Sequence, residues 1–215
     1  MARLTIRVPS LWMAGFGIVS GLLSDVSLSL PLPGVLGLIE APIYPGLMFG
    51  LAIAAGAYLF GGASWWRAGL VLALTLIAWI AAFRGSVMIY EALAADWIAG
   101  QGAAPLGSGG SIDPAEALHL KDALKANLLP LIASLMAGGA IGAGGTALGA
   151  AVAVARLRHP IAWLSTASIG ALCALGLFLG DALLGSPPGL EFTALFVTWQ
   201  ALVAASIGYG MRPGA

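Results

Sequence analysis

The chain has 215 residues, of which 60% are hydrophobic and only 8% are charged, and its mean hydropathy is +0.99. Because about a quarter of the residues of a soluble domain are charged, this composition excludes an ordinary soluble protein and predicts one embedded in the lipid bilayer. The formal net charge is zero, so we expect no nucleic-acid partner. The single cysteine, Cys173, cannot form an internal disulfide, and we expect it to be a small apolar residue within a helix.

Six apolar segments predict an all-α integral membrane protein with six transmembrane helices in a single polytopic domain, 1–215. The first segment follows Arg3 and Arg7 and stops at Pro31. Since no small-residue cleavage site follows it, we expect a retained helix rather than a signal peptide. The expected spans are 11–30, 45–62, 68–90, 128–154, 161–184 and 190–211.

The connection 91–127 is the longest polar segment and separates the third span from the fourth. Its glycine- and serine-rich part predicts a loop. After it, the capping pattern from Asp113 to Glu116, with lysines further on, predicts a short amphipathic helix outside the membrane. The composition of 31–45 and 85–100 fits re-entrant, interfacial or spanning structure equally well, so that choice stays open.

The fourth span, 128–154, has no charged residue and contains a row of small residues on one helical face. In lipid such a helix persists, because an unsatisfied backbone group costs several kcal/mol there, and glycines allow a second backbone to approach closely. We therefore predict a helix-packing interface whose partner is a helix of this chain or of another protein. The row consists of Ser134, Gly138, Gly142, Gly145 and Gly149.

The charges of alternate connections are strongly asymmetric, which predicts the orientation of the chain. The connections on the N-terminal side of the membrane contain arginines and no acidic residue. The acidic residues lie on the opposite side or in the half of the membrane next to it. We therefore expect both termini in the cytoplasm of a bacterial-type inner membrane, with 91–127 in the periplasm. The arginines on the N-terminal side are Arg3, Arg7, Arg67, Arg156, Arg158 and Arg212.

Four charged residues near the outer ends of spans are candidates for binding an ion or a solute: Asp25, Arg84, Asp181 and Glu191. A charge in a span is costly and is a functional-site hypothesis by default. One interpretation is a periplasm-facing vestibule that binds a cation or polar solute or relays protons, and the other is an ion-pair network near the interface. The adjacent Trp199 and Gln200 predict an interhelical hydrogen bond or a pocket wall.

No hydrolase, zinc-protease, NTPase or lipid-transferase motif occurs, and we expect both histidines, His119 and His159, to lie outside the bilayer. We therefore expect no catalytic residue, no metal and no cofactor. The sequence favours a non-catalytic membrane subunit or scaffold that packs against helices of other subunits or of further copies of itself. The alternative is a small-solute or ion transporter or channel, or its substrate-binding subunit, that uses the outer carboxylates.

Overall fold

The computed structural model describes residues 8–27, 42–95, 128–184 and 190–212, which form helices and no strand. The expected all-α fold is therefore confirmed for this part of the chain. The surface helix expected near Asp113 lies outside the described residues. The helices are α1 (Pro9–Ser27), α3 (Ile43–Leu59), α4 (Trp65–Leu93), α7 (Leu128–Ala153), α8 (Pro160–Leu184) and α9 (Leu190–Gly210), with a 3₁₀ helix η1 (Ala155–Arg158).

Four of these helices are long and apolar enough to cross a membrane: α1, α4, α7 and the Thr193–Gly210 part of α9. Helix α3 and the Pro160–Leu175 part of α8 are shorter apolar helices. These lengths and compositions indicate a membrane location. Helix α4 extends beyond the expected 68–90 at both ends, so the first residues of the ambiguous segment 85–100 are its last turns.

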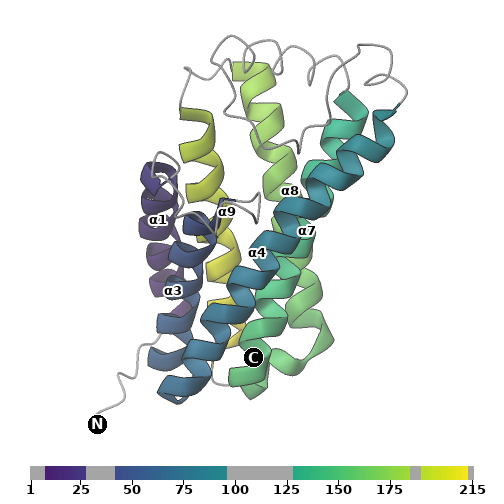
Figure 1. Cartoon of the computed structure of the whole chain (residues 1–215). Helices are drawn as coiled ribbons and strands as arrows, with labels where there is room; N and C mark the ends of the chain where they lie inside the picture. Colours follow the sequence, from purple (N-terminus) through teal and green to yellow (C-terminus); the bar gives the residue numbers. More distant parts are fainter. Residues whose placement is uncertain (1–7, 28–41, 96–127, 185–189, 213–215) are drawn as a thin grey trace, which may run out of the picture.

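The six helices form a closed ring in chain order. Each helix packs against the next along the chain, and α9 packs back against α1 (Figure 1). The start of α1, the turn 60–64, η1 and the end of α9 lie at one end of the bundle, which we call the basal end. The opposite, distal end holds the ends of α1, α4 and α8. At the basal end, Arg212 Nη2 donates a hydrogen bond of 2.7 Å to Ser10 Oγ, which joins the last helix to the first.

The small-residue row of α7 packs against α4. A Cβ added at Gly145 would lie 2.7 Å from Ala78 Cβ, and one added at Gly149 would lie 2.9 Å from Leu74 Cβ, both closer than real Cβ atoms approach. Packing of this kind drives helix association in lipid, where no hydrophobic effect operates between helices. The facing pairs are Gly138 with Ser86, Gly142 with Ala82, Gly145 with Ala78 and Gly149 with Leu74.

Two further glycine contacts join helices of the ring. On α1, a Cβ added at Gly21 would lie 2.6 Å from Val197 Cα of α9, and Gly17 one turn earlier meets the same helix. Between α7 and α8, Gly139 and Gly170 pack directly on each other, each against the other's backbone carbonyl. Close glycine contacts therefore join three helix pairs of the ring: α4 with α7, α7 with α8, and α1 with α9.

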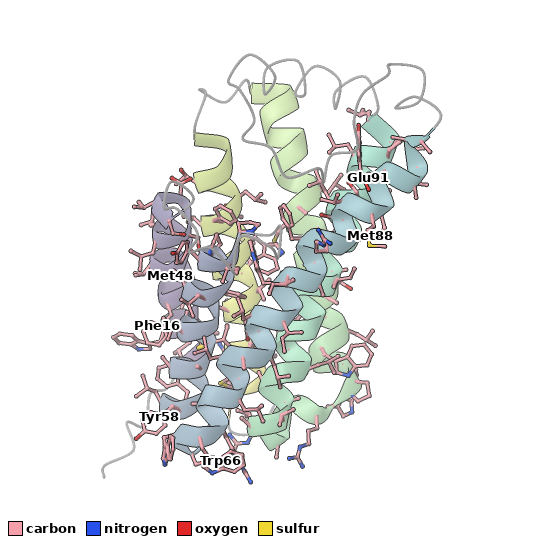
Figure 2. All side chains as sticks on the ribbon, in the orientation of Figure 1. Phe16, Met48, Tyr58, Trp66, Met88 and Glu91 are labelled. Carbon is pink, nitrogen blue, oxygen red and sulfur yellow. The ribbon has the colours of Figure 1, made fainter. Side chains whose placement is uncertain are left out.

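The interior of the basal half is filled by apolar side chains. Met13 of α1, Ile53 of α3 and Ile207 of α9 are completely or almost completely buried there, and Leu157 of η1 seals the end. Several aromatic residues of the basal end are instead exposed on the outside, as Figure 2 shows for Tyr58 and Trp66. Any space within the ring must therefore lie in its distal half.

Candidate functional site

A cavity of about 300 Å³ lies inside the distal half of the ring. It is bounded by α4, α7, α8 and α9 and by Pro42, which precedes α3. Helices α4 and α9 are not neighbours in the ring, so their side chains meet only across this space. The larger side chains in its wall are Trp79, Phe83, Leu135, Leu195, Phe196 and Trp199, and Ala174 is the lining residue of α8.

Two tryptophan rings close the cavity toward the basal end. Trp79 and Trp199 are the most basal lining residues of α4 and α9, and their ring centroids are 6.1 Å apart at an interplanar angle of 69°. Trp199 also packs on the buried Phe49 of α3 at 5.2 Å. The Trp79 ring is fixed by a hydrogen bond of 2.7 Å from its Nε1 to the carbonyl oxygen of Pro42. The cavity therefore ends blindly near the middle of the bundle.

The wall of the cavity is almost entirely apolar. Trp79 donates its indole N–H to the carbonyl oxygen of Pro42, and Ser86 Oγ donates to the carbonyl oxygen of Phe83 at 2.8 Å. Trp199 Nε1 is fully enclosed and has no hydrogen-bond partner among the described residues, and its ring lies against those of Phe49 and Trp79. A molecule in this cavity would therefore be held by burial of apolar surface rather than by hydrogen bonds.

Asp25 lies in the distal part of α1 and is half-buried. Its Oδ2 accepts a hydrogen bond of 2.7 Å from Thr193 Oγ1 of α9. A hydroxyl donor of this kind stabilises a carboxylate where two helices meet. Asp25 thus takes part in the contact between α1 and α9 and is not among the described residues that line the cavity.

The other three charged candidates lie on different helices near the same end. Arg84 is an exposed residue of α4. In the ring, α3 lies between α4 and α1, the helix that carries Asp25. Asp181 lies in the last turn of α8 and Glu191 in the first turn of α9, at the distal end. Their side chains lie outside the described part of the structure. Among the described residues, Asp25 is joined to Thr193.

The hydrogen bond expected from Gln200 is confirmed. Its Nε2 donates to Ser24 Oγ of α1 at 2.9 Å, and its Oε1 accepts from Ser20 Oγ. Ser24 Oγ also donates to the carbonyl oxygen of Ser20 at 2.7 Å, so the buried cluster is satisfied. This cluster holds α1 and α9 together beside the glycine contact. Trp199, one residue earlier, is a wall of the cavity, which was the second possibility for this pair.

The cavity itself and the residues Trp79, Phe83 and Phe196 were missed by the sequence analysis. One signal was present: Trp79 and Trp199 lie in the middle of apolar segments, whereas tryptophan in membrane proteins concentrates at the interfaces. The exposed Trp65 and Trp66 at the basal start of α4 follow that rule, and the two mid-span tryptophans depart from it. Ser134, the first residue of the small-residue row, is buried and donates to the carbonyl oxygen of Leu131.

Within the described residues, no group of three His, Cys, Asp or Glu side chains is placed to hold a metal ion. The distal cavity is therefore the candidate binding site in this part of the chain. No protein-family model, curated protein or solved structure matches the chain.

Proposed function

We propose that this chain is a non-enzymatic membrane protein that binds a small solute in its distal cavity, as a transporter or as the solute-binding subunit of one. The observation that carries the proposal is the half-open cavity of about 300 Å³ that is lined by four helices and closed at its basal end by Trp79 and Trp199. Ligand sites commonly have volumes of about 300–1,000 Å³ and mainly apolar and aromatic walls. Because neither Asp25 nor Arg84 is among the described lining residues, solute binding is assigned to the cavity rather than to the outer charges.

We further propose six membrane crossings with both termini in the cytoplasm of a bacterial-type inner membrane. Helix α3 has 17 residues and rises about 26 Å, which is close to the thickness of the hydrocarbon core. Arg67, Arg156 and Arg158 are exposed at the basal end, and Arg67 lies over the exposed Trp66 ring. The positive-inside rule and the interfacial preference of tryptophan require both features of a cytoplasmic face. The cavity would then be reached from the periplasmic side.

A comparison of co-purified small molecules tests the binding proposal. Leu195 of α9 lines the cavity, so Leu195→Trp fills it, whereas Leu202 on the same helix is 47% exposed, so Leu202→Trp is a matched control. The proteins are extracted in mild detergent, and their bound compounds are released with organic solvent and identified by mass spectrometry. We expect a compound that co-purifies with the wild type and with Leu202→Trp and is lost from Leu195→Trp.

A second pair of variants, on α7, separates loss of the bound compound from misfolding. Leu135→Trp fills the cavity from the other side, and Leu129, which is 78% exposed, provides the control Leu129→Trp. Each variant is first checked for a monodisperse elution profile. If properly folded cavity-filled variants retain the same compounds as the wild type, the cavity is not the binding site and the proposal is wrong.

The second candidate is the non-catalytic subunit or scaffold that packs against other subunits or further copies. The row of small residues on α7 no longer favours it, because α4 covers that row. Its support is the outer face of α8, where Ser165 and Ser168 are exposed. Small hydroxyl residues on a span can contact another helix closely. The mass of the complex in the same detergent extract distinguishes the two candidates. A stoichiometric partner protein, or a mass that is a multiple of the chain mass, supports the subunit or scaffold. A mass equal to that of one chain contradicts it.

A further inference from the structure

The size of the cavity limits its ligand, given that the cavity binds one as proposed above. An engineered apolar cavity of about 150 Å³ in another protein stays dry and binds benzene. The present cavity, at about 300 Å³, has room for roughly two such rings. Because Trp79 and Trp199 close it toward the basal end, it offers no continuation for a longer molecule in that direction.

The wall favours a flat ring system over a flexible chain. Trp79 of α4 packs against Phe196 and Trp199 of α9 and forms one aromatic end of the cavity with them. Phe83 adds a further ring to the wall, and Gly138 and Gly139 leave their part of the α7 wall without side chains. Aromatic pairs in offset or edge-to-face contact gain affinity beyond the apolar area that they bury. A rigid ring also loses less conformational freedom on binding than an acyl chain of the same carbon number, which must order each rotatable bond.

The polar groups near the cavity are already used or enclosed. The indole N–H of Trp79 is bound to the Pro42 carbonyl, the hydroxyl hydrogen of Ser86 is bound to the Phe83 carbonyl, and Trp199 Nε1 has no exposed surface. A ligand atom that must accept a hydrogen bond would lose its water and gain no donor from these groups, which is unfavourable. The cavity therefore discriminates against an acceptor atom in a molecule of the same shape.

We infer that the ligand is a flat, apolar compound of about two fused rings that makes no required hydrogen bond. The reporter is 1-fluoronaphthalene, whose ¹⁹F resonance is recorded with the full chain in detergent micelles. We expect a protein-bound resonance with the wild type and with Leu202→Trp, and none with Leu195→Trp. The pair Leu135→Trp and Leu129→Trp repeats the comparison from α7.

Competition between ligands then tests the ligand class. Every competitor concentration is expressed as its concentration in the detergent micelles, so that differences in partitioning between water and micelle do not affect the comparison. Naphthalene should displace the reporter at about one tenth of the concentration that decane or quinoline requires. Decane has the same number of carbons as naphthalene, and quinoline has the same shape with one acceptor nitrogen. Decane as effective as naphthalene would mean a site for lipid chains. Quinoline as effective as naphthalene would mean a hydrogen-bonding site. Either result overturns the inferred class and leaves solute binding in place.

Failure of the inference and failure of the proposed function are distinguishable. If no probe gives a bound resonance but a co-purified compound is still lost from Leu195→Trp, the ligand belongs to another class and only the inference is wrong. If neither the resonance nor such a compound is found, the cavity binds nothing, and both are wrong.

Discussion

Single glycines set how closely neighbouring helices approach. At Gly170 of α8 an added Cβ would overlap the carbonyl oxygen of Gly139 and the Cβ of Ala143, both on α7. Backbone atoms cannot move aside as a flexible side chain can, so the two helices would have to separate. Gly69 of α4 lies in a different environment, with nothing within 4 Å of an added Cβ.

Gly170→Ala and Gly69→Ala therefore form a matched pair with opposite expectations. Gly170→Ala should destabilise the protein by about 1–3 kcal/mol, the usual cost of overpacking, and lower its melting temperature in detergent. Gly69→Ala should be neutral or stabilising by up to about 1 kcal/mol, because alanine favours a helix more than glycine does. Circular dichroism during heating measures both. A Gly170→Ala protein as stable as the wild type would show that α7 and α8 are not this close.

At the scale of elements, the helix positions followed from the sequence but the helix partners did not. Apolar runs ended by proline or glycine located all six described helices to within a few residues. In the structure, four of the small residues of α7 lie close to α4. A pattern on one helix does not say which helix lies against it, so α4, another helix of the same chain, was only one of the possible partners.

A cysteine cross-link tests the pairing of α7 with α4. A Cβ at Gly142 would lie 3.1 Å from Ala82 Cβ, so Ala82→Cys with Gly142→Cys should form a disulfide after a shift of a few tenths of an ångström. Cys173 is changed to alanine in all samples. Oxidation should protect both thiols from a maleimide polymer without changing the chain mass.

The control for this cross-link replaces Ala82→Cys by Ile77→Cys, because Ile77 is 60% exposed on the outer face of α4. This pair should keep its thiols reactive after oxidation. A band of twice the chain mass from Ala82→Cys with Gly142→Cys would instead show that the glycines of α7 face a second copy.

At the scale of the whole molecule, the cavity results from the closure of the ring. Its walls come from helices far apart in the sequence, and α4 and α9 meet there although neither packs on the other as a ring neighbour. No local pattern encodes such a meeting, which is why the cavity could not be predicted while its mid-span tryptophans could be noticed. The sequence showed where the outer charges lie along their helices, but which of them contact one another depends on helix packing, which no local pattern encodes.

The proposal that solute enters from the periplasm depends on the two ends of the bundle facing opposite sides of the membrane. Helix α4 has 29 residues and rises about 43 Å, so its two ends report on both sides. Ser64, before its basal end, and Ala92, in its distal last turn, are both exposed. Figure 2 shows Trp66 and Glu91 near these two positions at opposite ends of the bundle.

The decisive measurement is labelling of Ser64→Cys and Ala92→Cys, each in a chain with Cys173→Ala, by a membrane-impermeant maleimide. In intact bacterial cells we expect Ala92→Cys to react and Ser64→Cys to react only after the membrane is opened. Labelling of Ser64→Cys in intact cells would place the basal end outside the cell. Failure of Ala92→Cys to react there would mean that the distal end is not exposed to the periplasm. Either result would contradict the proposed orientation.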